Sequence, residues 1–144
     1  MKPKFKGQVI VFEQVLLFSI GIVILITSLS LFMMYQNYYL ASTTQDQLTE
    51  VKEYVLSNII GLCNNGGANS TVVLPIPRRV GTSLYKISLS NSGINITTEP
   101  KSDINDFSTL YRLNQTFSFS GMVVSDLGKM VLYKNGNAIT IDRR

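Results

Sequence analysis

The chain has 144 residues, a net charge of +4 and a single cysteine, so one small domain plus one membrane segment is the natural division and no intrachain disulfide is possible. It lacks histidine, the usual general base near neutral pH and the commonest metal ligand, so we expect neither an enzyme nor a metal or cofactor site. A nucleic-acid interface needs clustered basic residues, and the only adjacent pairs are Arg78-Arg79 and Arg143-Arg144, so we expect none.

A basic leader precedes a long apolar segment at the start of the chain. Lys2, Lys4 and Lys6 belong to the leader, whereas residues 9–34 contain one ionisable side chain, Glu13. Residues 15–34 would span roughly 30 Å as a helix, about the thickness of one hydrocarbon core. Because basic residues before a span keep the N-terminus in the cytoplasm, we expect a single-span protein whose remaining chain is extracellular.

The apolar segment is expected to be a permanent anchor rather than a cleaved secretory signal. A secretory signal has an apolar core of about 7–15 residues and a small-residue cleavage site. Here the apolar run is longer, and residues 35–39, which contain three tyrosines, offer no such site. Tyr35, Tyr38 and Tyr39 are instead typical of an aromatic belt at the far membrane interface.

The helix is predicted to continue beyond the membrane, from about residue 8 to about residue 62. No proline occurs between Pro3 and Pro75, and the residues after Gly21 contain no glycine until Gly61. Apolar residues recur with a helical period of 3.6 along one face: Leu48, Val51, Val55, Ile59 and Leu62. The charged residues of this region are expected mostly off that stripe: Asp46, Glu50, Lys52 and Glu53.

After Gly67 the pattern changes to short strands separated by turns. Six strands are predicted, at residues 71–76, 84–89, 93–98, 116–124, 129–133 and 138–141. The Asn135-Gly136 pair predicts a hairpin between the last two strands, and residues 100–106 are expected to be a polar loop. These elements indicate a small antiparallel sheet or sandwich, covered by the apolar stripe of the helix.

Three glycosylation sequons lie in the β-rich region and none precedes it. Their acceptors are Asn69, Asn95 and Asn114. Because glycosylation requires exposure on the translocated side of the membrane, their placement agrees with the topology that the lysines predict. Chance remains an alternative in a chain so rich in Asn, Ser and Thr.

The leader and the span together resemble the class III signal of archaeal type IV pilin-like proteins. The residues that carry the resemblance are Lys4-Phe5-Lys6-Gly7 followed by the apolar Gln8-Val9-Ile10-Val11-Phe12-Glu13. The resemblance implies that a prepilin peptidase recognises Lys4, Lys6, Gly7 and Gln8 and cuts between Gly7 and Gln8. The family carries glutamate at the fifth mature position, whereas Glu13 would be the sixth.

Glu13 and Cys63 each have two interpretations, one in which the residue has no special role and one in which it takes part in assembly. Glu13 either sits at the headgroup boundary or pairs with a cation, for which the free amine of a neighbouring processed Gln8 is a candidate that would set the register of assembly. Cys63 either is a buried structural thiol or forms an intermolecular disulfide.

The predicted fold class is α+β, with a long N-terminal helix followed by a small antiparallel β-sheet or sandwich. The predicted segments are a leader (1–7), a transmembrane helix (8–35), an amphipathic continuation (36–63) and an extracellular β-domain (68–144). The resemblance implies a filament subunit that polymerises through its N-terminal helix. Its implied partners are further copies, the membrane, a prepilin peptidase, a platform protein and a secretion ATPase. The alternative is a non-polymerising membrane-anchored sandwich, similar to archaellum stator proteins that contact the surface layer.

Overall fold

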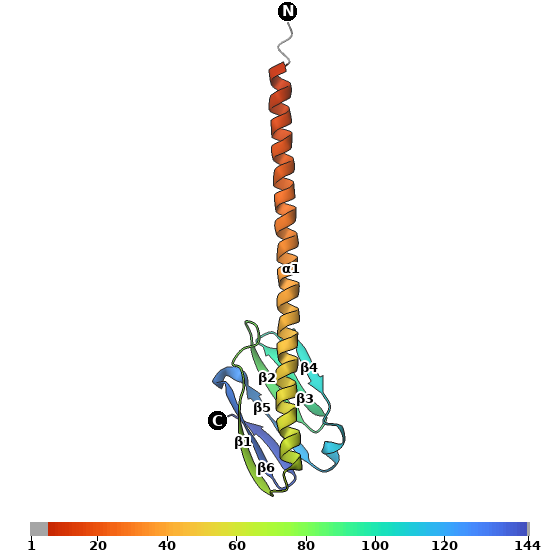
Figure 1. The fold of residues 1–144 in the computed structure, drawn as a ribbon, viewed down its shortest axis with the longest axis vertical. Helices are drawn as coiled ribbons and strands as arrows, with labels where there is room; N and C mark the ends of the chain where they lie inside the picture. The colour runs from red at the N-terminus through yellow and green to blue at the C-terminus, as the bar shows by residue number, and fades with distance from the viewer. Residues whose placement is uncertain (1–5, 144) are drawn as a thin grey trace, which may run out of the picture. The chain divides into compact units, whose positions relative to one another are not determined.

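One long helix, α1 (Lys6–Asn64), precedes a β-rich region in the computed structural model, which describes residues 6–143, with side chains from residue 10 onward (Figure 1). The chain divides into two compact units between Tyr39 and Leu40. The predicted helix, residues 8–62, is confirmed to within two residues at each end. It ends where Asn65 N–H donates to the Gly61 carbonyl at 3.1 Å, just before Gly66 and Gly67.

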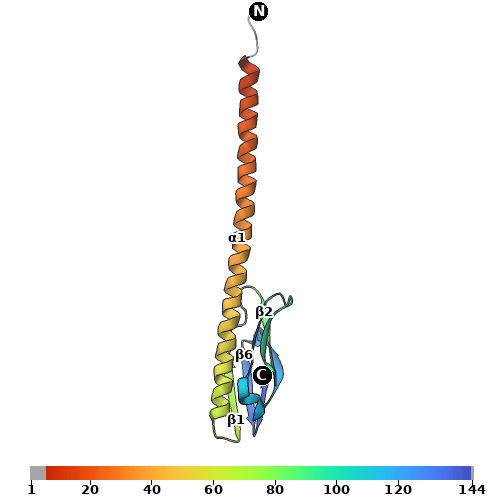
Figure 2. The same cartoon turned by 90° about the vertical axis from the view of Figure 1, so that its right-hand side faces the viewer.

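The second unit contains one seven-stranded sheet, so the sheet interpretation is right and the sandwich is wrong. Its order is β1-β6-β7-β5-β2-β3-β4. The strands are β1 (Asn69–Pro75), β2 (Leu84–Ser90), β3 (Gly93–Glu99), β4 (Asn105–Ser108), β5 (Ser118–Val124), β6 (Lys129–Asn135) and β7 (Ala138–Asp142). Two short 3₁₀ helices flank β5: η1 (Tyr111–Gln115) and η2 (Ser125–Leu127). Residues 40–64 of α1 cover one face of the sheet and replace a second β-layer (Figure 2).

The core lies between this part of α1 and the covered face of the sheet. The predicted stripe is confirmed, since Leu48, Val51, Val55, Ile59 and Leu62 are all buried. The strands contribute alternate residues to the same core, among them Tyr85, Ile87, Ile94, Ile96, Leu132 and Ile139. Alternation is what places these side chains on one face, because successive residues of a strand point to opposite sides of the sheet.

The predicted hairpin between the last two strands is confirmed, with its turn one residue later than expected. Asn135 pairs with Ala138, so Gly136 and Asn137 are the central residues. Of these two, Gly136 alone has a positive φ, at 57°. Glycine at the first central position is typical of a type II′ turn rather than the expected type I′ turn.

One prediction about the sheet is wrong, and one strand pairing departs from the antiparallel pattern, which otherwise is confirmed. Residues 105–108, expected to lie in or beside a loop, form β4 and pair with β3 at the edge of the sheet. The pair β5–β7 is parallel in an otherwise antiparallel sheet. The chain reverses at η2, so β5 and β6 run in opposite directions. Because β7 lies between them and is antiparallel to β6, it must run parallel to β5. Gly121 permits this close approach, since a Cβ there would lie 2.3 Å from the Ile141 carbonyl oxygen.

Candidate assembly surface and polar sites

The N-terminal half of α1 exposes apolar side chains around its whole circumference. Every side chain described from Ile10 to Tyr39 is exposed, and the large hydrophobic ones include Phe12, Leu17, Phe18, Ile24, Phe32 and Met34. A helix that is apolar on all sides belongs in a bilayer or among other apolar helices. Among the described residues, α1 is the one helix long and apolar enough to cross a membrane.

Three hydroxyl groups within this apolar surface are satisfied by the helix itself. The hydroxyls of Ser19, Thr27 and Ser30 donate to carbonyls four residues earlier, at 2.8, 2.5 and 2.9 Å. No hydroxyl of these three therefore needs water, which makes the segment compatible with lipid. At the end of the segment Tyr35 and Tyr39 lie with ring centroids 5.8 Å apart.

The predicted processing residues and Glu13 lie at the start of this surface. Lys4 lies outside the described residues, and Lys6, Gly7 and Gln8 begin α1 without described side chains. Glu13 is exposed, and within the described part of the chain it takes part in no ion pair.

The three sequon asparagines do not gather into one site. Asn69 and Asn114 are exposed, at the start of β1 and in η1, and Asn95 is half-buried on β3. Asn95 lies on the sheet face opposite α1, because its neighbours Ile94 and Ile96 are buried in the core. Five strand spacings separate β1 from β3, roughly 24 Å, so any glycans would be spread across the domain.

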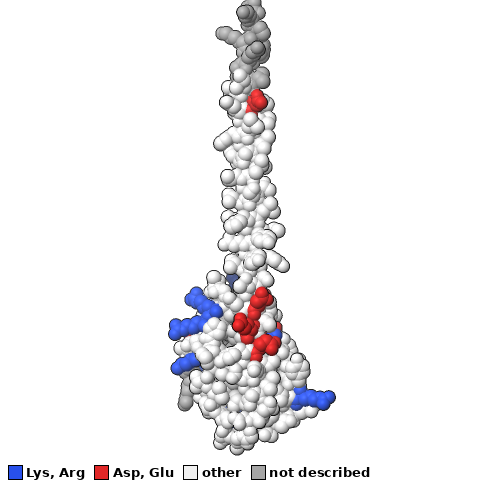
Figure 3. Space-filling model, viewed as in Figure 1, with Lys and Arg blue, Asp and Glu red and all other residues white. Residues whose placement is uncertain are grey.

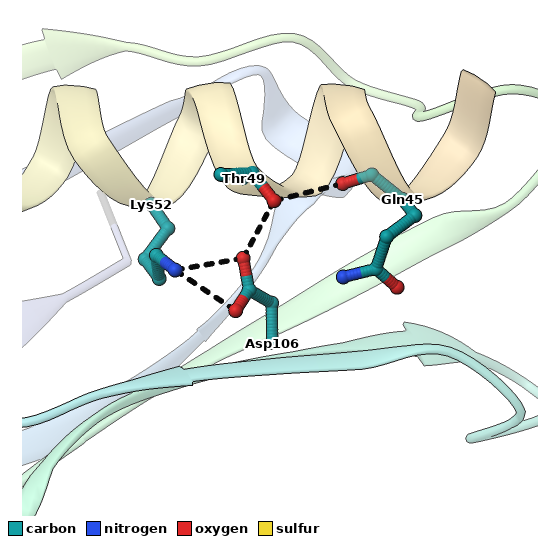
Figure 4. A network of polar contacts seen from close by, with 4 residues as sticks. All are labelled: Gln45, Thr49, Lys52 and Asp106. Atoms are coloured by element: carbon teal, nitrogen blue, oxygen red, sulfur yellow. Dashed lines mark hydrogen bonds and ion pairs between the residues drawn. The ribbon is translucent and has the colours of Figure 1, made fainter. Parts of the chain in front are cut away.

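A buried ion pair joins α1 to the edge strand β4 (Figure 4). Lys52 Nζ lies 2.8 Å from each carboxylate oxygen of Asp106, and these side chains are 10% and 15% exposed. The Thr49 hydroxyl lies 2.8 Å from Asp106 Oδ2 and 3.1 Å from the Gln45 carbonyl oxygen. With one proton to donate, the hydroxyl favours the charged acceptor. The prediction that Lys52 lies off the buried stripe is wrong, because it is four residues after Leu48 and so falls at the edge of the same face.

A second buried lysine closes the C-terminal end of α1. Lys134, on β6, donates to the Leu62 carbonyl at 3.0 Å and to the Asn65 carbonyl at 2.5 Å. The Leu62 carbonyl is among those that a helix end leaves without partners, and a cation there also offsets the negative end of the helix dipole. Its ammonium group also lies 5.5 Å from the centroid of the Phe117 ring. Lys134 therefore fixes the helix end against the sheet.

Cys63 is a free, half-buried thiol beside this lysine. Burial raises the pKa of the Cys63 thiol, and the nearby charge of Lys134 opposes that rise without cancelling it. The thiolate is the reactive form of cysteine, so a raised pKa makes the residue less reactive near neutral pH. This environment favours the structural interpretation of Cys63 over a readily formed intermolecular disulfide.

We expect the alkylation rate of Cys63 in the native chain to rise with pH at a higher midpoint than in the denatured chain. Because a raised pKa delays formation of the thiolate, native alkylation near pH 8 should be several-fold slower. The measurement is the pH–rate profile for iodoacetamide, with and without denaturant. Steric protection would slow the reaction at every pH, so a midpoint equal to or below that of the denatured chain would contradict the expectation.

Comparisons with protein-family models, with curated proteins and with solved structures find no match for this chain. Within residues 10–143, no three side chains of the metal-binding types gather where they could hold an ion. The prominent features of the described structure are an exposed apolar helix segment and a domain with its own hydrophobic core.

Proposed function

We propose that this chain is a structural subunit of an archaeal type IV pilus-like surface filament. It would polymerise through the N-terminal half of α1 and present its β-domain outward. The observation that carries the proposal is the apolar surface around the whole helix over residues 10–39, joined to a domain that has its own core. Such a helix can be stored in a membrane and then transferred to a bundle of like helices, since both environments are apolar.

The basic leader and the proposed cleavage site support this function over a simple anchor. An anchor needs the apolar span but has no use for a cut between Gly7 and Gln8. Processing would place a new amine at Gln8, five residues before Glu13. A prepilin peptidase, a platform protein and a secretion ATPase would be the partners of this maturation and assembly.

The test of the proposed function is the N-terminus and location of the native protein. A filament subunit should appear in sheared surface filaments, and N-terminal peptide mass spectrometry should find Gln8 as its first residue. A non-polymerising anchor should remain in the membrane fraction and retain the leader. That second outcome would overturn the filament proposal in favour of an anchored domain that contacts the surface layer.

We expect Glu13→Gln to lower filament yield by about tenfold while leaving membrane insertion intact. The substitution removes the charge that would pair with the Gln8 amine of a neighbour, and one lost charge-assisted contact of about 1.5–3 kcal/mol corresponds to roughly ten- to hundredfold. Filament mass per cell is the measurement, and the membrane pool of processed subunit is the internal reference. Normal filament yield from the glutamine variant would show that Glu13 has no role in assembly.

A further inference from the structure

The charges of the second unit form two patches of opposite sign. Within residues 40–143 the ion pairs are Lys52–Asp106, Lys86–Glu99 and Arg143–Asp126. Most of the acidic and basic residues left outside these pairs fall in two groups. An acidic stripe consists of Asp46, Glu50 and Glu53, and a basic patch consists of Arg78, Arg79 and Lys129.

The acidic stripe follows one face of α1. Its residues are spaced four and three positions apart, so they line up along the helix, and all three are exposed. Figure 3 shows acidic side chains gathered over this part of the helix. Three like charges in a row repel one another mildly and contribute nothing to the core. Their alignment therefore offers a surface for a positively charged partner.

The basic patch combines a loop with the start of a strand. Arg78 lies across Gly128, the residue before Lys129, and Lys129 pairs with Pro75 at the end of β1. The Ser125 hydroxyl donates to the Arg78 carbonyl at 2.8 Å. The N–H of Gly81 donates to Gln47 Oε1 of α1 at 2.7 Å, which ties the same loop to the helix. These bonds fix the backbone that carries the arginines, so the patch is preorganised.

The two patches border one groove. The groove has a volume of about 540 Å³, with Glu50 on the helix wall and Arg79 on the loop wall. Its other lining residues include Tyr54, Pro75 and Pro77. Across the groove the structure records no ion pair between stripe and patch, among the residues that it describes. Each patch is therefore free to meet the opposite charge on another molecule, with an apolar surface beside it.

We propose that the acidic stripe of one copy binds the basic patch of the next copy, and that this contact joins the β-domains laterally. The inference rests on the proposed function, which places parallel copies side by side. Figure 3 shows the acidic cluster on the front of the domain and basic side chains at its edge, at similar height. Parallel neighbours can then bring opposite charges together without a shift along the helix. Because the stripe of one copy meets the patch of the next, two different surfaces are joined, so the contact is heterologous and propagates along a chain of subunits.

Mixed cross-linking of the full-length protein in its membrane tests this contact directly. In a Cys63→Ser background, Asp46→Cys and Lys129→Cys chains with different tags are co-expressed and treated with a flexible bis-maleimide. The contact predicts a species that joins the two variants at about tenfold higher yield than either like pair, because opposite patches attract and like patches repel. Mixed and like pairs in equal yield would overturn the inference.

Charge reversal provides the matched control in the same assay. Glu50→Lys with Glu53→Lys, or Arg78→Glu with Arg79→Glu, should each lower the mixed yield by about tenfold. When both chains carry all four substitutions, the two patches again have opposite charges, so most of the mixed cross-link yield should return. A folding defect would instead persist in the chain with four substitutions. Arg112→Glu, at an exposed residue outside both patches, should leave the yield unchanged. Failure of the four-residue exchange to restore the yield would also overturn the contact.

The same cells distinguish this inference from the proposed function. Filaments that form normally without enrichment of the mixed cross-link would overturn the contact and leave the function supported. An enriched mixed cross-link without processed Gln8 chains in sheared filaments would support the contact and overturn the function.

Discussion

Replacing Asp106 by alanine is expected to destabilise the β-domain by about 3–5 kcal/mol, the usual result of removing one partner of a buried ion pair. The substitution leaves the Lys52 ammonium without its carboxylate at a side chain that is only 10% exposed. It also removes the charged acceptor of the Thr49 hydroxyl, which keeps only the Gln45 carbonyl at 3.1 Å. Because a domain of this size is stable by about 5–15 kcal/mol, such a loss is a large part of the total.

The measurement is thermal unfolding of the full chain in detergent micelles, where the midpoint should fall by more than about 10 °C. Two controls separate the buried charge from the loss of packing. Lys52→Met with Asp106→Leu replaces both charges by apolar groups of similar size and should be close to wild type or more stable. Thr49→Val removes only the hydroxyl and should cost about 1 kcal/mol. An alanine variant as stable as the double variant would contradict the expected cost of burying Lys52 alone.

The length of α1 and its buried stripe could be predicted from the sequence because both depend on local rules. Residues 22–60 contain neither glycine nor proline, and the 3.6-residue period of Leu48, Val55 and Ile59 already indicates one buried face. Strands such as β2 and β3 were likewise predictable, because apolar and polar residues alternate between two turn signals. The exposure of the apolar surface at residues 10–39 also follows from composition. A single small domain has no further part that could cover so long an apolar segment.

The elements that escaped prediction depend on contacts between distant residues. The strand β4 contains Asn105, Asp106 and Phe107 and has no apolar alternation, so β3 and the ion pair with Lys52 are what hold it. The parallel pairing of β7 with β5 follows from strand order, which no local pattern encodes. The burial of Lys52, in contrast, is predictable from helical spacing, because its position four residues after Leu48 places it at the edge of the buried face.

Of the two charged patches, one could be predicted from local sequence and the other depends on residues that are distant in the chain. Arg78-Arg79 taken alone predicts only a solvated turn, and nothing local connects the pair with Lys129, fifty residues later. The sheet brings them together through the pairing of Pro75 with Lys129. The acidic stripe, in contrast, could be read directly from helical spacing. The basic patch in the proposed contact could therefore be found only from the fold, whereas the exposed apolar surface of residues 10–39 could be predicted from the sequence.

Ile24→Asp together with Leu25→Asp is expected to abolish stable membrane insertion, because these residues lie at the centre of the span formed by residues 15–34. Thirteen Leu, Ile, Val and Phe residues in that span favour insertion by about 4–8 kcal/mol in total. Two aspartates at the centre oppose it by about 5–7 kcal/mol and also remove two of the favourable contributions. The balance then no longer favours the bilayer.

Alkaline carbonate extraction followed by flotation is the measurement. The double aspartate variant should move to the soluble or aggregated fraction, whereas Ile24→Ala with Leu25→Ala, which shortens the same side chains without charge, should remain in the membrane. Retention of the aspartate variant in the bilayer would contradict the assignment of residues 15–34 as the span. Subunits of a filament must pass through the membrane before they polymerise in the proposed function. Loss of insertion should therefore remove the variant from sheared filaments as well, even though its β-domain keeps the core formed by residues 40–143.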